Sequence, residues 1–275
     1  MPTIDARILP FHLILALSLA GCAAGDTPSM SERAGSPGQP ATSDATATSA
    51  SGATNPSPTS SPSPLETSCH GPGDFEPLPI GAQCWIDLAT DADMPVRISY
   101  TIPGPGWSAF IGAYKDVEVG NDVQFVNVLI ADIENVTINA CNQQQPAKPP
   151  LGASVGDLAA ALARLPPFEV TSPPADVTAY GYNGMHVQIR VPLDQVYRVD
   201  FGTFIGCQES VLRSWIATPL SFAFSGYVAP GDTEDFWILD VDGTRVVIVA
   251  LATANASEDL RAEQQAVLDS IAIEP

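Results

Sequence analysis

The chain has 275 residues and carries a formal net charge of −20, from 31 acidic and 11 basic side chains. Such a surface repels nucleic-acid phosphates and anionic lipid headgroups, so the composition excludes a nucleic-acid-binding protein. An acidic excess alone indicates solubility and does not imply calcium. Apart from an N-terminal signal and a low-complexity tract, about 200 residues remain, which is enough for one domain with a proper core.

A short apolar run near the N-terminus ends on a cysteine. Residues 13–20 are too few to cross a bilayer as a helix, for which roughly 18 are needed, but they fit the apolar region of an export signal. Leu19-Ala20-Gly21-Cys22 resembles a bacterial lipobox. We therefore expect a signal peptide over 1–21 and a lipid-anchored mature chain that begins at Cys22, on the extracytoplasmic face of the membrane. The alternative is a buried N-terminal helix with Cys22 as an ordinary thiol.

Residues 22–66 are almost entirely Ser, Thr, Pro, Ala and Gly. This composition predicts a disordered tether that extends at about 3 Å per residue and so reaches up to about 100 Å. Such tracts are also candidates for O-glycosylation. Residues 67–94 contain clusters of Gly and Pro and predict an irregular lead-in, clamped by a disulfide, ahead of a globular domain over 95–275.

Besides Cys22 the chain has four cysteines: Cys69, Cys84, Cys141 and Cys207. An even number in an exported chain predicts two disulfides, with three possible connectivities. Proximity favours Cys69 with Cys84, which leaves Cys141 to pair with Cys207. No C-x-x-C pair occurs, so the spacing does not favour a metal site, and nothing in the sequence indicates a cofactor.

The predicted domain begins with strands and one clear helix. A first strand is expected from Val96 to Ile102, and an apolar, β-branched run predicts one or two more over 123–136. A helix is expected over 155–164, because apolar residues recur at helical spacing and Ser154 with Asp157 forms a capping-box pattern. Pro166 and Pro167 then end it.

Two hairpins, a helix and a short strand are expected to follow. The first hairpin spans 175–191 with its turn at Asn183-Gly184, and the second spans 235–252 with its turn at Asp242-Gly243. Residues 221–228 form another strand candidate. A helix over 258–270 and a strand over 271–273 close the chain. Antiparallel hairpins with helices packed across them predict an α+β fold.

The order of these elements, with the Pro-Gly-Trp turn ending at Trp107 and the segments 237–243 and 267–271, resembles the PsbP-like α/β/α sandwich of secreted actinobacterial lipoproteins of the Lpq type. The resemblance covers residues 95–275. It implies a non-catalytic binding or accessory domain, and no set of catalytic residues comes with it.

A G-x-S-x-G pattern at residues 152–156 raises the alternative of a serine hydrolase. A nucleophile elbow needs a buried strand immediately before the serine, whereas prolines precede this one, and Ser154 already fits a helix cap. A triad also needs a histidine. The chain after Cys22 offers His70, in the lead-in, and His186. We therefore expect no catalytic residues.

The remaining polar candidates are weighed against simpler interpretations. His186 and Arg190 lie on the polar face of a predicted strand, where they are either solvated or part of an anion-binding groove. The segments 240–243 and 231–235 are acidic, and we interpret both as turns. The segment 231–235 is the first place to look for a calcium ion. Trp107, Trp215 and Trp237 are expected in the core.

The sequence thus predicts a membrane-anchored binding or accessory domain. Its expected partners are the membrane, through Cys22, and a cell-wall component or protein. The alternatives are a cell-envelope hydrolase and a purely structural wall lipoprotein.

Overall fold

The computed structural model describes residues 66–68, 76–88, 96–109, 111–198, 203–218, 223–224 and 229–274. All of them belong to one compact unit, residues 59–275. The predicted signal, the anchor at Cys22 and, apart from residue 66, the predicted tether lie outside the described residues. So does most of the strand candidate over 221–228. None of the helices described is long and apolar enough to span a membrane.

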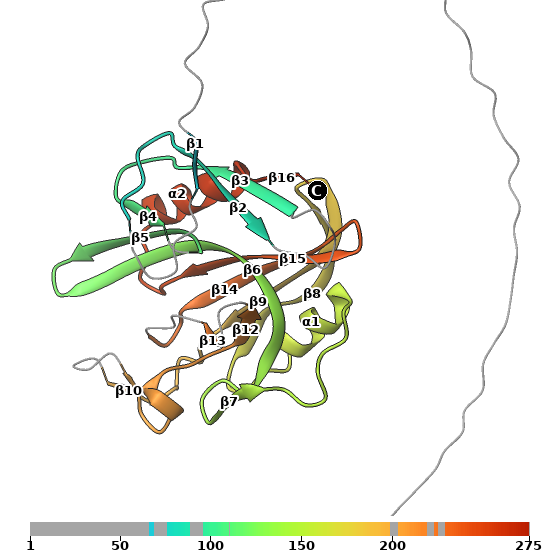
Figure 1. Ribbon diagram of the computed structural model, residues 1–275. Coiled ribbons are helices and arrows are strands. Elements are labelled where there is room, and N and C mark those ends of the chain that lie inside the picture. The colour runs from blue at the N-terminus through green and yellow to red at the C-terminus, as the bar shows by residue number, and fades with distance from the viewer. Residues whose placement is uncertain are drawn as a thin grey trace, which may run out of the picture. The chain divides into compact units, whose positions relative to one another are not determined.

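A large antiparallel sheet forms the centre of the fold (Figure 1). Its strands follow the spatial order β13 (Ala223–Phe224), β12 (Trp215–Thr218), β6 (Asp122–Asn139), β15 (Thr244–Ala252), β14 (Thr233–Val241), β9 (Tyr182–Arg190) and β8 (Glu169–Ala179). Three more strands extend it, because β5 (Gly112–Val119) and β7 (Gln143–Pro146) pair with β6 and β4 (Trp107–Ala109) pairs with β5. The predicted run over 123–136 is therefore one long strand.

A smaller sheet contains β1 (Glu66–Ser68), β2 (Gln83–Leu88), β3 (Val96–Thr101) and β16 (Ala272–Glu274). Strands β3 and β16 confirm the predicted first and last strands. Strand β2 differs from the irregular lead-in that the sequence predicts. Cys84 and Ile86 of β2 are buried in the core, so the segment before residue 95 is part of the packed structure.

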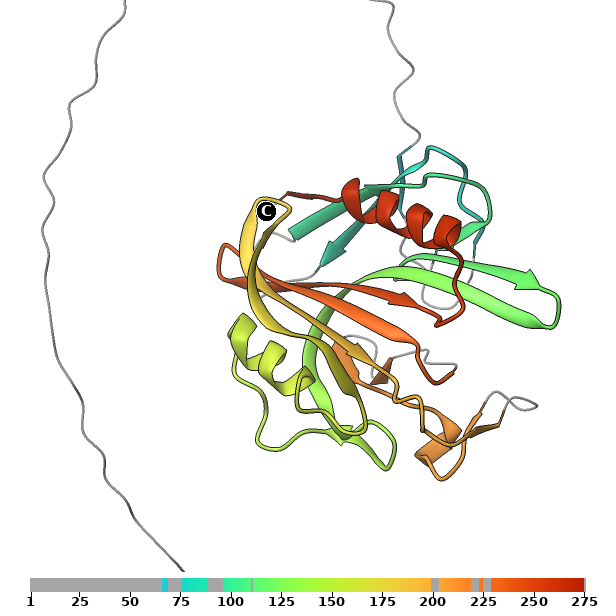
Figure 2. The ribbon, with the colours of Figure 1, turned by 180° about the vertical axis from the view of Figure 1, so that it is seen from behind.

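Both faces of the large sheet are covered. On β15, Val246, Ile248 and Ala250 pack with the small sheet and with helix α2 (Glu258–Asp269), whereas the alternating Val247, Val249 and Leu251 pack with helix α1 (Val155–Leu162) on the other face. Figure 2 shows α2 and α1 on opposite sides of the sheet. This explains why β15 reads as a continuous apolar run. The fold is α+β and rich in antiparallel sheet, as predicted.

Both helices begin where the sequence predicts. The Ser154 hydroxyl accepts a hydrogen bond from the Asp157 N–H at 3.1 Å, and Asp157 reaches back to the Ser154 backbone, which completes the capping box. Ser257 caps α2 through the N–H of Leu260. The face of α2 that carries Leu260, Gln264 and Val267 is buried. The Gln264 amide donates to two strand carbonyls, those of Asn127 and Leu251.

The second hairpin is confirmed, with β14 and β15 joined at Asp242-Gly243, but the first has a different turn from the one predicted. Strands β8 and β9 are joined at Tyr180-Gly181, where both residues have positive φ, and Asn183-Gly184 lies inside β9. A Cβ on Gly184 would lie 2.1 Å from the Ile238 carbonyl oxygen of β14. The close approach of these two backbones requires glycine at this position of the strand.

Candidate binding site

An open cavity of about 710 Å³ lies at one end of the large sheet. Four segments that are distant in sequence enclose it: the start of β6, the wall segment (residues 192–198 and 203–205), the turn over 229–232 and the loop over 253–255 that follows β15. The hairpin formed by β5 and β6 and the strand β10 (Tyr197–Arg198) project on the same side of the molecule (Figures 1 and 2). The volume falls in the range of small-molecule sites.

The lining combines apolar surface with polar groups. Half of the lining residues are apolar or aromatic, namely Val123, Phe125, Tyr197, Ala229, Pro230 and Ala254. Asn121, Gln195, Thr253 and Asn255 contribute neutral hydrogen-bonding groups, and Asp122 and Asp232 contribute carboxylates. An apolar surface with a few convergent polar groups can hold a ligand that has both an apolar and a polar part.

Asp232 is fully buried and holds two sides of the cavity together. Its carboxylate accepts from the Ala229 N–H and from the Ala254 N–H, each at 2.9 Å. Thr253 ties the same loop to β6, because its N–H and side chain bond to the backbone of Phe125 at 3.0 Å. These hydrogen bonds join the floor of the cavity to the sheet.

The acidic segment over 231–235 is therefore structural. Asp232 holds backbone N–H groups, and the buried Glu234 accepts from the Ser214 hydroxyl at 3.0 Å. Asp235 faces the opposite side of the strand and bonds to His186 and Gln188. Among the described residues, no three His, Cys, Asp or Glu side chains are grouped to hold a metal ion.

The wall segment is fastened to the rest of the fold by a disulfide. Strand β10 pairs with β11 (Thr203–Phe204), and the Tyr197 and Phe204 rings lie 4.9 Å apart with Phe204 buried. Cys207 follows β11 and forms the predicted disulfide with Cys141, at the end of β6. Cys84 is also disulfide-bonded, as predicted, and its expected partner Cys69 lies outside the described residues.

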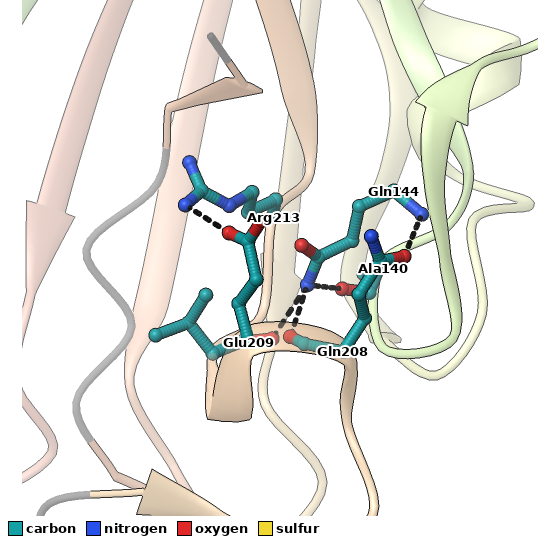
Figure 3. A network of polar contacts seen from close by, with 6 residues as sticks. Ala140, Gln144, Gln208, Glu209 and Arg213 are labelled. Atoms are coloured by element: carbon teal, nitrogen blue, oxygen red, sulfur yellow. Dashed lines mark hydrogen bonds and ion pairs between the residues drawn. The ribbon is translucent and has the colours of Figure 1, made fainter.

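The side chain of Gln144 bonds to backbone carbonyl groups on both sides of this disulfide in sequence (Figure 3). The Gln144 side chain donates to the carbonyl oxygens of Ala140 at 3.0 Å, Gln208 at 3.2 Å and Val211 at 2.7 Å. Arg213 bonds to Glu209 at 2.7 Å beside it. The one-turn helix η1 (Gln208–Ser210) is thus fixed against the turn between β6 and β7, which holds the end of the wall in place.

Exposed apolar side chains occur in two of the segments that form the cavity. Val123 is 51% exposed on the side of β6, and Leu193, Val196 and Ile205 of the wall segment are 69%, 57% and 50% exposed. The methyl group Cδ2 of Leu193 lies close to Gly231, next to the lining residue Pro230. Apolar side chains left in water around a cavity are typical of a binding surface.

Tyr197 presents a neutral phenol to the cavity. Burial raises the pKa of Tyr197, and the nearby charge of Asp232 raises it further. At neutral pH the side chain is thus an uncharged hydrogen-bond donor on an aromatic ring.

His186 and Arg190 occupy one face of β9, as predicted, but neither lines the cavity. His186 lies 3.0 Å from the Asp235 carboxylate, and Gln188 donates to the same carboxylate at 2.7 Å. The His186 ring is tilted at 45° to the ring of Trp237, with 5.2 Å between their centroids. Arg190 pairs with Glu169 at 2.5 Å. His186 and Arg190 are thus each paired with a carboxylate.

Ser154 and the tryptophans have structural positions. The Ser154 hydroxyl donates to the Asp157 carboxylate at 2.6 Å and sits at the N-cap of α1 in extended backbone, so the G-x-S-x-G pattern forms a helix cap and not a nucleophile elbow. Trp107 and Trp215 are fully buried, as predicted, whereas Trp237 is half-buried.

Local sequence patterns do not predict the cavity, because its lining residues come from four separate segments. The one signal was the apolar Leu193 and Val196 in a stretch between two predicted hairpins, where solvated loop residues are the norm.

No family model matches the chain, and a comparison with curated proteins found no match. Among solved structures, the chain matches LpqN, described as involved in cell envelope biogenesis of Mycobacterium tuberculosis, with 13% identity and a TM-score of 0.28 over 74% of this chain and 91% of that one. A likeness at this TM-score assigns neither a family nor a function.

Proposed function

We propose that the chain is an extracytoplasmic binding protein, held at the membrane by a lipid on Cys22, whose cavity receives an amphipathic small molecule of the cell envelope. The observation that carries the proposal is the 710 Å³ cavity, half of whose lining residues are apolar or aromatic. The exposed apolar side chains of Val123 and Leu193 at its mouth support it.

The location rests on the sequence and on the disulfides. The lipobox pattern ending at Cys22 supports export and anchoring. Disulfides at Cys84 and between Cys141 and Cys207 fit an oxidising compartment, since cytosolic proteins rarely keep them. The proposal includes the PsbP-like, Lpq-type assignment, which rests on the order of elements in the sequence. Mass spectrometry of the exported protein is expected to find an acylated Cys22 as the first residue, and an unprocessed, unacylated N-terminus would contradict the location.

The binding role can be tested with the full chain carrying Cys22→Ser, refolded under oxidising conditions. A neutral alkyl glycoside below its micelle concentration is expected to shift the NMR signals of the Val123 and Leu193 methyl groups. Ala254→Phe fills the cavity while keeping the N–H that Asp232 accepts, so it should abolish the shifts. Ala175→Phe is the matched control, because Ala175 is exposed on β8 outside the cavity.

Two results would contradict the proposal. If the alkyl glycoside leaves both methyl signals unchanged, the cavity does not take amphiphiles. If Ala254→Phe binds the probe as well as Ala175→Phe does, binding occurs elsewhere on the surface. Either result would favour a purely structural role in the cell wall.

A further inference from the structure

The charges around the cavity are strongly one-sided. Its two charged lining residues, Asp122 and Asp232, are both carboxylates. Asp194 adds another in the wall segment, next to the lining residue Gln195. The formal charge in and beside the cavity is thus mainly negative.

The hairpin of β5 and β6 adds two more carboxylates on the same face as the lining residues. Glu118 is the cross-strand partner of Val123, and Asp116 is the partner of Phe125. Directly paired residues of an antiparallel sheet share one face, so both carboxylates lie on the side of the hairpin that presents Val123 and Phe125 to the cavity. Both residues are exposed.

Two guanidinium groups lie near these five carboxylates. Arg198 follows Tyr197 in β10. Arg261 extends from α2 and donates to the carbonyl oxygens of Thr253 at 2.8 Å and Ala256 at 3.2 Å. The local balance therefore stays negative.

Aromatic rings accompany the carboxylates. Phe125 and the neutral Tyr197 both line the cavity. The face of an aromatic ring attracts an ammonium ion, and it does so most strongly where water is partly excluded. A ligand with an alkyl chain and a cationic head would satisfy the apolar lining, the rings and the carboxylates together.

We propose that the cavity selects amphiphiles that carry a positively charged ammonium headgroup over neutral and anionic amphiphiles with the same alkyl chain. This inference rests on the proposed function, because it specifies the class of ligand for the same cavity. Charge complementarity decides between the ligands, and the shared alkyl chain supplies the part of the affinity that is common to all of them.

The test compares three dodecyl probes below their micelle concentrations: dodecyltrimethylammonium, dodecyl maltoside and dodecyl sulfate. Calorimetric titrations use the full chain with Cys22→Ser, while far-UV circular dichroism monitors the fold. The ammonium probe is expected to bind about tenfold more tightly than the maltoside. One cation–π contact and one exposed ion pair together supply about the binding free energy that this ratio requires. The sulfate is expected to bind most weakly.

A double variant locates the source of the preference. Glu118→Gln with Asp122→Asn should reduce the ratio of the ammonium-probe affinity to the maltoside affinity at least threefold. Glu134→Gln with Asp176→Asn is the matched control, because it removes the same charge from exposed positions outside the cavity. The control should keep the wild-type preference.

The outcomes separate this inference from the proposed function. Equal binding of the ammonium and maltoside probes would overturn the inference and leave the proposed function standing. An equal loss of preference in the control variant would also overturn it, because the preference would then come from the net charge of the whole protein. If none of the three probes binds, both proposals fail.

Discussion

Removing the disulfide that fastens the wall segment, by Cys141→Ala with Cys207→Ala, should destabilise the domain strongly without unfolding it. The bond joins residues 66 apart in sequence. In the chain-entropy model a closed loop of this length contributes about 4 kcal/mol to the free energy of unfolding. Domains of this size are typically stable by about 5–15 kcal/mol, so most molecules of the variant should stay folded.

The wall segment of the cavity should also stay in place without the disulfide. Gln144 keeps its three hydrogen bonds, and the Gln208 N–H still donates to the residue 141 carbonyl at 2.7 Å. Each such bond contributes about 0.5–1.5 kcal/mol. Gln144→Ala in the oxidised protein is the comparison, with an expected cost of about 1–3 kcal/mol.

Equilibrium urea unfolding, followed by circular dichroism, measures both costs. The account expects the disulfide variant to lose more stability than Gln144→Ala, with the two-state transition retained. A loss below about 1 kcal/mol for the disulfide variant would refute the reasoning, because the cross-link would then not restrict the unfolded chain as the chain-entropy model requires.

Three further predictions concern the scaffold. Gly184→Ala should lower the free energy of unfolding by about 3 kcal/mol or more, because its Cβ would meet the Ile238 carbonyl oxygen. Gly181→Ala lies at a turn with open space and should lower it by about 1 kcal/mol. Urea midpoints in the reverse order would place the turn at Asn183-Gly184 after all. Lys115→Met should lower the free energy of unfolding by about 2 kcal/mol, because Lys115 is buried and pairs with Glu263 at 2.7 Å. A thermal unfolding midpoint unchanged from wild type would count against a stabilising role for that pair. Hydrogen bonds from Ser154 hold the pKa of Asp157 below its usual 3.8, so the wild type should lose this stabilisation as the pH falls through that lowered pKa. Asp157→Asn should therefore lose less stability on acidification than the wild type. Parallel acid titrations of the two proteins would contradict this.

Local patterns predicted the elements whose determinants lie close together in sequence. The capping box of Ser154 and Asp157 and the turn at Asp242-Gly243 each depend on residues within one turn, and the structure confirms both. The turn of the first hairpin was wrong for a non-local reason. Val187 and Ile189 fall on the buried face with either turn, so the alternation cannot choose between them, and the choice depends on how Gly184 meets β14.

Other features depend on tertiary contacts. Strand β2 carries Cys84 and Ile86 in alternation, but nearby glycines and prolines favour a loop, and pairing with β3 decides the outcome. The cavity is less predictable still, because Phe125, Tyr197 and Asp232 come together only when the sheet has formed.

The most direct test of the central claim is a crystal structure of the full chain with an ammonium amphiphile whose alkyl chain ends in bromine. Anomalous scattering locates the bromine without reference to the protein model. The account predicts a bromine site within the cavity, between Val123 and Tyr197. A bromine site elsewhere, such as over Trp237 on the face of β9 and β14, would contradict it.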